Sequence, residues 1–134
     1  MYSIKEIAAK FGLRASTIRY YEEIGLLENV VHEGGYKRVY DETHIDRLSA
    51  IECFKKARLS LEEIKQFFEY EKDIHSNSGN ILEMMKAKEL KTKEEINRLK
   101  AGLEHVQMKI KYYSAVDEAI KEGREIPAWG DIIK

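Results

Sequence analysis

The side chains with the clearest binding chemistry lie in one short segment near the N-terminus, residues 15–23. Arg19 carries a planar guanidinium that can bind a phosphate group through two parallel hydrogen bonds. Ser16 and Thr17 carry short hydroxyl groups that donate or accept a hydrogen bond, and Tyr21 carries a hydroxyl on a rigid ring. This set can bind a phosphate backbone but reads base edges only modestly, so DNA is a candidate ligand.

A second group of cationic and aromatic side chains follows at Tyr36, Lys37 and Arg38. β-forming residues lie on both sides of Gly34-Gly35, which predicts a small hairpin within residues 26–40. Beside the first segment, these three side chains would hold a flanking phosphate backbone and add little base specificity.

Two short helices are predicted to position the first segment. Ser3 and Glu6 match a capping box that begins a helix over residues 3–11, and Gly12 is placed to end it. The second helix covers residues 15–23. Two such helices joined by a turn of about four residues form a helix-turn-helix, and a hairpin that follows it is a wing.

Two further helices are expected after the hairpin. One covers about residues 43–57, capped by Asp41 or Thr43. The other runs from a capping box at Ser60 to about Tyr70. Apolar side chains at helical spacing give each helix one face to bury: Ile45, Leu48, Ile51 and Phe54 on the first, and Leu61, Ile64, Phe67 and Phe68 on the second.

One long predicted helix, residues 80–122, follows a linker rich in Ser and Asn at residues 75–79. Apolar side chains recur along it at alternating steps of three and four, as in a coiled coil. A helix about 60 Å long at 1.5 Å per residue cannot bury such a stripe alone. We therefore expect a second copy of the chain to cover it in an antiparallel homodimer. This apolar stripe comprises Leu82, Met85, Ile96, Leu99, Leu103, Val106, Ile110 and Tyr113, with interruptions at Glu89 and Thr92.

A C-terminal tail, residues 123–134, leaves the long helix at Gly123 and is too apolar to stay free in solvent. Docking of this tail would bring Trp129 close to Tyr112 and Tyr113. The three rings would form either a pocket for an apolar small-molecule effector or simple packing of the tail, and packing is the favoured interpretation.

Bulk composition does not identify the partner. The net charge is −1, so DNA binding has to depend on where the basic residues lie. No apolar run approaches the roughly 20 residues that a membrane span needs, and Lys5, Glu6 and Lys10 interrupt the segment where a secretory signal would be continuous. We expect a cytoplasmic protein with no membrane partner and no cofactor.

The string Thr17-Ile-Arg-Tyr-Tyr-Glu-Glu-Ile-Gly-Leu-Leu27 resembles the second helix and turn of MerR-family transcription regulators. Gly35-Tyr-Lys-Arg-Val-Tyr40 is similar to the wing of that family, with Lys37-Arg38 where the family has one basic residue. Residues 45–64 resemble its next two helices. The matching motifs run in order over residues 2–68. Which of Lys37 and Arg38 corresponds to the phosphate-binding arginine of the family stays open.

The resemblance implies a mainly α protein. Its winged helix-turn-helix DNA-binding domain would cover residues 1–74, followed by the linker at 75–79. The antiparallel coiled-coil dimerisation helix would cover residues 80–122, and the tail at 123–134 would dock on the dimer.

The resemblance also implies a function. A dimer would bind double-stranded promoter DNA at a two-fold-related operator and distort it in response to a signal, so that RNA polymerase is affected through the DNA. A non-switching architectural DNA binder of the same fold and a pure coiled-coil adaptor are the alternatives. An enzyme is not expected, because the sequence shows no Ser/His/Asp grouping and no glycine-rich phosphate loop.

Cys53 is the one cysteine of the chain, so an internal disulfide is excluded and a soft-metal site with several thiolates is not expected. The resemblance implies that Cys53 is a sensor thiol. A single-cysteine branch of the family, which responds to aldehydes and other electrophiles, carries its reactive thiol in this helix. A neighbouring Lys56 or Arg58 would favour the thiolate. The alternative is a buried structural cysteine.

Overall fold

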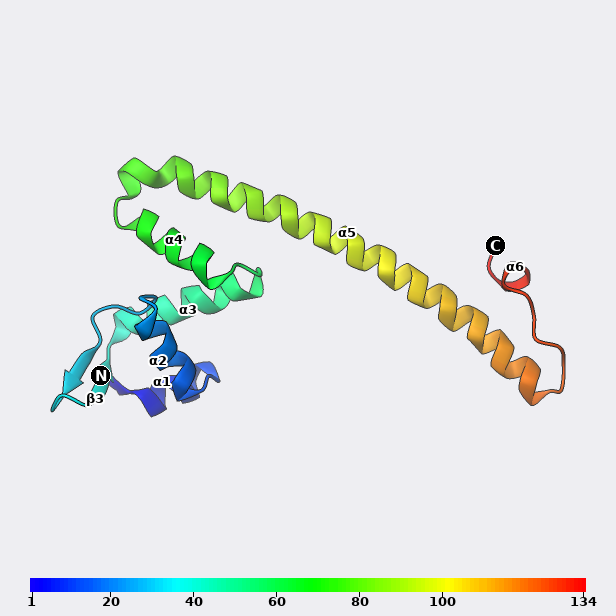
Figure 1. Ribbon diagram of the computed structural model, residues 1–134, viewed down its shortest axis with the longest axis horizontal. Coiled ribbons are helices and arrows are strands. Elements are labelled where there is room, and N and C mark those ends of the chain that lie inside the picture. Colours follow the sequence, from blue (N-terminus) through cyan, green and yellow to red (C-terminus); the bar gives the residue numbers. More distant parts are fainter. The chain divides into compact units, whose positions relative to one another are not determined.

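The computed structural model describes residues 1–134 and is mainly helical, as predicted (Figure 1). The chain separates into two compact units, Met1–Lys86 and Ala87–Lys134. None of its helices has the length and apolar character needed to cross a membrane. The elements in chain order are β1 (Tyr2–Ser3), α1 (Ile4–Phe11), α2 (Ala15–Glu23), β2 (Val31–Glu33), β3 (Lys37–Tyr40), α3 (Glu42–Lys56), α4 (Leu61–Glu71), α5 (Ile74–Lys121) and α6 (Trp129–Ile132).

The predicted helix-turn-helix is confirmed in α1 and α2. The Ser3 hydroxyl accepts from the Glu6 backbone N–H at 3.2 Å, and the Glu6 carboxylate accepts from the Ser3 N–H at 3.2 Å. Gly12 ends α1 in the left-handed region, at φ 64°, a conformation that costs glycine little. Arg14 stands at the N-cap of α2 and makes no side-chain cap, because its side chain carries no oxygen acceptor.

The predicted wing is confirmed as the antiparallel pair β2 and β3. Gly34 and Gly35 connect the strands with φ values of 62° and 79°, which a tight hairpin turn requires and other residues rarely adopt. A Cβ on Gly34 would lie 3.3 Å from the Tyr36 ring. Sequence patterns do not indicate β1, which pairs with β3 on the other side to give the sheet order β1-β3-β2.

α3 begins at Asp41, one of the two predicted caps, whose carboxylate accepts from the Thr43 N–H at 2.9 Å. His44 adds a second contact at this helix start: its Nδ1 accepts from the Asp41 N–H at 3.0 Å, and its Nε2 lies 2.8 Å from the Glu28 carbonyl oxygen. α4 begins at the Ser60 capping box, as predicted.

One hydrophobic core lies between the helices of the first unit and the base of the wing. Each of α1, α2, α3 and α4 contributes its apolar face, and Met85 of α5 packs against the edge of the cluster. The large side chains that are fully buried are Ile7, Ile18, Tyr21, Leu26, Leu27, Tyr40, Leu48, Ile51 and Ile64.

The prediction of a linker at residues 75–79 is wrong, because these residues lie in the first turns of α5, which spans 48 residues. Asp73 provides the physical reason. Its carboxylate accepts from the Ser76 N–H at 3.4 Å, and its carbonyl accepts from the Asn77 N–H at 3.1 Å. Asp73 therefore begins the helix ahead of Asn80, and a single Gly79 costs only about 1 kcal/mol of helix stability.

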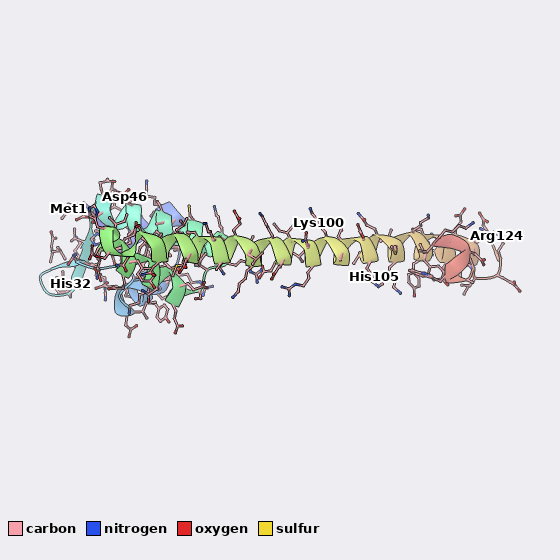
Figure 2. All side chains as sticks on the ribbon, turned by 90° about the horizontal axis from the view of Figure 1, so that it is seen from above. Met1, His32, Asp46, Lys100, His105 and Arg124 are labelled. Carbon is pink, nitrogen blue, oxygen red and sulfur yellow. The ribbon has the colours of Figure 1, made fainter.

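Most of the apolar stripe on α5 is exposed in the single chain. Leu99 is 73% exposed and Leu103 is 56% exposed. Figure 2 shows α5 with the side chains of Lys100 and His105 projecting from its middle.

Candidate nucleic-acid interface

The helix α2 divides its side chains between the core and solvent. Ile18 and Tyr21 are three residues apart, so they share one face, and both are buried. Ser16 and Arg19 lie on the exposed side, and Thr17 is half-buried at the border. The predicted binding residues Ser16 and Arg19 are therefore accessible to a ligand.

The prediction that Tyr21 contacts DNA is wrong for this structure, because the ring is only 2% exposed. Its hydroxyl accepts a hydrogen bond from Lys55 Nζ at 2.8 Å. This hydrogen bond raises the pKa of Lys55 above its ordinary value. The neighbouring Tyr20 is 48% exposed and takes the place on the outer face that was expected for Tyr21. Tyr21 is three residues from Ile18, and this spacing could have shown from the sequence that Tyr21 is buried and Tyr20 exposed.

α2 and the wing form a shared hollow, here called the helix–wing hollow. Arg38 comes from β3 of the wing, while the other lining residues come from α2. The lining residues are Ser16, Arg19, Tyr20, Glu22, Glu23 and Arg38. Two guanidinium groups, two hydroxyl groups and two carboxylates thus line one open surface. The guanidinium and hydroxyl groups can bind phosphate oxygens, and Oε2 of Glu22 accepts a hydrogen bond from Arg38.

Glu22 joins α2 to the wing and was not recognised from the sequence as a site residue. Its Oε2 accepts from Arg38 Nε at 2.7 Å, and its Oε1 lies 3.4 Å from His32 Nε2. The Glu22 side chain is 19% exposed. Its spacing of three residues from Arg19 on the same helix was the available signal, whereas the wing contact links residues 16 positions apart.

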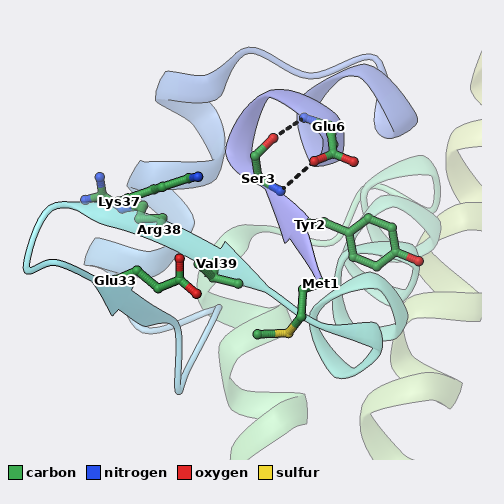
Figure 3. Close-up of a pocket in the computed structure, with 8 residues that line it drawn as sticks. All are labelled: Met1, Tyr2, Ser3, Glu6, Glu33, Lys37, Arg38 and Val39. Atoms are coloured by element: carbon green, nitrogen blue, oxygen red, sulfur yellow. Dashed lines mark hydrogen bonds between the residues drawn. The ribbon is translucent and has the colours of Figure 1, made fainter.

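The remaining wing candidates lie at and near the tip. Tyr36 is 83% exposed, and Lys37 is also exposed. Figure 3 shows Lys37 and Arg38 on β3 at a second, smaller hollow, with the Ser3–Glu6 capping box at its other side. This hollow has a volume of about 170 Å³ and mixes acidic with basic side chains, so it favours no single ligand charge.

Tyr40 lies under this surface and is fully buried. Burial raises the pKa of its hydroxyl to about 12, and the nearby Glu22 carboxylate adds to the increase, while Arg38 and Arg19 oppose it. The hydroxyl has no hydrogen-bond partner.

The proposed sensor and effector residues are not among those that line either hollow. Cys53 is a free, exposed thiol on α3, so the alternative of a buried structural cysteine is wrong. No group of three or more His, Cys, Asp or Glu side chains is arranged to hold a metal ion.

In the second unit, the tail packs against the end of α5. The Tyr112 hydroxyl donates to the Pro127 carbonyl oxygen at 2.8 Å, and the Tyr112 and Trp129 ring centroids are 5.1 Å apart. Lys109 Nζ lies 4.8 Å from the Trp129 ring centroid. Tyr113 contacts Tyr112 and stays 58% exposed. The three aromatic residues are brought together, and their contacts are those of tail packing.

Residues 2–71 match the domain described as MerR HTH family regulatory protein. The chain belongs to the MerR family. MerR-family members are DNA-binding transcription regulators, which agrees with the accessible Arg19 of α2 and the accessible Arg38 of the wing.

Individual MerR-family relatives match both the domain and the longer chain. HTH-type transcriptional regulator AdhR of Bacillus subtilis is 38% identical over 65 residues, a match that covers 48% of this chain and 46% of that protein. HTH-type transcriptional regulator YfmP of the same organism is 31% identical over 121 residues, with 88% of this chain and 86% of the relative covered.

A solved structure is similar over almost the whole chain. It is the crystal structure of HiNmlR, described as a MerR family regulator lacking the sensor domain, bound to promoter DNA. It is 30% identical, covers 92% of this chain and 91% of its own, and gives a TM-score of 0.72. A putative MerR-family regulator from Listeria monocytogenes gives a TM-score of 0.76 at 25% identity, with 92% and 93% covered.

Proposed function

We propose that this MerR-family regulator binds promoter DNA as a homodimer and distorts it in response to a signal. The observation that carries the proposal is the helix–wing hollow, where Arg19 of α2 and Arg38 of the wing face one accessible surface. The likeness to a regulator solved on promoter DNA supports the same use of this surface here.

The second subunit is inferred from the apolar stripe. Exposed leucines and isoleucines at heptad spacing cost free energy in water, and a matching helix would bury them. A second copy of α5 offers the same stripe, and the antiparallel arrangement places a DNA-binding unit at each end of the pair. Such a dimer matches a two-fold-related operator.

Each DNA-binding unit would place the N-terminus of α2 in the major groove. Ser16 and Thr17 would then face base edges, while Arg19 would bind a phosphate. Tyr36, Lys37 and Arg38 would hold the flanking backbone. Because few of these side chains discriminate strongly between bases, we expect the cost of deforming the DNA to supply much of the specificity. RNA polymerase would be affected indirectly, through the changed promoter shape.

Two measurements test this function. Light scattering should give twice the 15.7 kDa mass of one chain, and a single-chain mass at micromolar concentration would contradict the dimer. Selection from a randomised duplex pool should recover two-fold-related sites whose affinity falls steeply with salt. Failure to enrich any duplex would contradict DNA recognition, and recovered sites without two-fold symmetry would contradict the paired arrangement.

The signal is proposed to act on Cys53 or on the aromatic residues Tyr112, Tyr113 and Trp129. The exposed thiol supports reaction with an aldehyde or another electrophile. The aromatic residues can bind an apolar small molecule only if the tail moves off α5, since they now contact each other and the tail. In vitro transcription from a selected promoter, with Cys53→Ser as the variant, distinguishes the two. Loss of the aldehyde response supports the thiol, and an unchanged response excludes it.

A further inference from the structure

Glu22 contacts both strands of the wing from the recognition helix α2. His32 of β2 and Arg38 of β3 are directly opposite each other in the hairpin register, so their side chains project on the same side of the sheet. Both reach the same carboxylate, Arg38 at 2.7 Å and His32 at 3.4 Å. A single acidic side chain thus connects three elements of the DNA-binding unit.

The atom that Arg38 uses determines what remains available for DNA. Its hydrogen bond to Glu22 is made through Nε, so the two terminal Nη groups are not committed to the carboxylate. A guanidinium can bind phosphate oxygens in parallel through its terminal groups. Arg38 also lines the helix–wing hollow together with Arg19, so its terminal groups are within reach of a phosphate bound at this surface.

We propose that Glu22 is a positioning residue for DNA recognition, which holds the Arg38 guanidinium in the orientation that binds phosphate and fixes the wing relative to α2. This role rests on the proposed function of the helix–wing hollow. It also assigns the phosphate-binding position of the wing to Arg38 in preference to the exposed Lys37.

Positioning by Glu22 and the negative charge of Glu22 should have opposite effects on DNA affinity, so the two can be separated by experiment. A carboxylate near DNA repels phosphates, so removing its charge should by itself raise affinity for every duplex. A positioning carboxylate instead improves the operator complex, in which the wing has to meet the backbone at a defined place. The readout is therefore the ratio of operator affinity to non-specific affinity.

The test compares Glu22→Gln with Glu23→Gln. Both lose one negative charge from the same hollow, but Glu23 makes no hydrogen bond to the wing. Affinities are measured on the duplex selected by the wild-type protein and on a scrambled duplex of equal length. Glu22→Gln should lower the affinity ratio by up to about ten-fold, because the amide oxygen can still accept from Arg38 but the charge assistance of the hydrogen bond is lost. Glu23→Gln should leave the ratio unchanged. Equal ratios for the two variants would overturn the proposal.

A double-mutant cycle with Arg38→Ala separates positioning from general destabilisation. Once Arg38 is absent, Glu22→Gln should cause no further loss in the ratio, whereas an undiminished loss would contradict action through Arg38. The Arg38 Nε–H resonance of the free protein gives a second readout. It should be resolved and slow to exchange in the wild type and averaged in Glu22→Gln. A resonance that is unchanged in the variant would also overturn the proposal.

The outcomes distinguish this inference from the proposed function. If the wild-type protein selects no duplex, the function fails. If the wild-type protein binds its selected duplex with salt dependence and Glu22→Gln does so with the same affinity ratio, only the role of Glu22 fails.

Discussion

Lys55 of α3 donates a hydrogen bond of 2.8 Å to the hydroxyl of Tyr21, so the packing of α3 holds the recognition helix by its buried face. Tyr40, which is also fully buried, has a hydroxyl without a partner. The Tyr21 hydroxyl should therefore stabilise the folded protein, whereas the buried, unpaired Tyr40 hydroxyl should destabilise it.

Removing the two hydroxyls should have different effects on stability. Tyr21→Phe loses a hydrogen bond from a charged donor and should lower the free energy of unfolding by about 1 kcal/mol. Tyr40→Phe removes a buried, unpaired polar group and should leave the free energy of unfolding unchanged or slightly higher. Urea denaturation of both variants measures the contrast. A larger loss for Tyr40→Phe than for Tyr21→Phe would contradict these assignments.

Alkaline pH should destabilise the fold through Tyr40. Its pKa is about 12 in the folded protein and near its ordinary value of 10.0 when exposed on unfolding. The unfolded state therefore loses the proton first, so the stabilisation is complete below pH 10 and is lost as pH rises toward 12, by up to about 1.4 kcal/mol per pH unit. Unfolding midpoints at pH 8, 10 and 11 should decline less in Tyr40→Phe than in the wild type. Parallel declines would show that another group is responsible.

The same glycine substitution should have opposite effects at two positions. Gly12 has φ 64° with open space around its Cβ position, so Gly12→Ala should cost about 1 kcal/mol through backbone strain alone. Gly79 lies inside α5, also with open space, so Gly79→Ala should stabilise the helix by about 1 kcal/mol. Thermal unfolding measures both. Destabilisation by Gly79→Ala would contradict a helical conformation at residues 75–79.

Arg19 should contribute to DNA affinity without dominating the choice of sequence. Arg19→Ala should weaken binding to selected and scrambled duplexes alike and reduce the slope of log affinity against log salt by about one. Arg98→Ala removes an equal charge from the second unit and serves as the control. Titrations at several salt concentrations measure the slope. Identical slopes for wild type and Arg19→Ala would place Arg19 outside the interface.

A charge on the apolar stripe should separate the subunits. In the proposed homodimer, Leu103→Glu would place two carboxylates in the seam between the subunits, and the desolvation of those charges should yield single chains near 15.7 kDa. His105→Glu introduces the same side chain two residues away, off the stripe, and should keep the dimer mass. Light scattering decides between them, and a dimer that survives Leu103→Glu would require a different interface.

The local elements could be predicted from sequence where a short-range rule decides them. The Ser3 and Ser60 capping boxes and the end of α1 at Gly12 each depend on residues within four positions. The apolar spacing of Ile18 and Tyr21 likewise predicted a buried face, although the site assignment of Tyr21 did not follow it. Gly34-Gly35 was enough to predict the wing.

Three features could not be predicted from the sequence, because they depend on contacts between distant residues or on competing local signals. β1 has two residues and no periodicity, and only its pairing with β3 makes it a strand. In the sequence, Glu22 looks like an ordinary surface carboxylate, and only the fold brings Arg38, 16 positions away, within hydrogen-bond distance of it. At residues 75–79, Ser and Asn favour a linker, but Asp73 caps the backbone there and the helix continues.

His44 has a mechanical consequence for the wing. One imidazole nitrogen binds the backbone just after β3, at Asp41, and the other binds the backbone ahead of β2, at Glu28. His44 therefore closes residues 29–40 into a loop through two hydrogen bonds at its base, and the tip of the loop lies far from these contacts in sequence. Residues added to such a loop change how far its tip reaches and leave the start of α3 in place. Insertions or deletions within residues 29–40 can thus alter the reach of the wing without altering the start of α3.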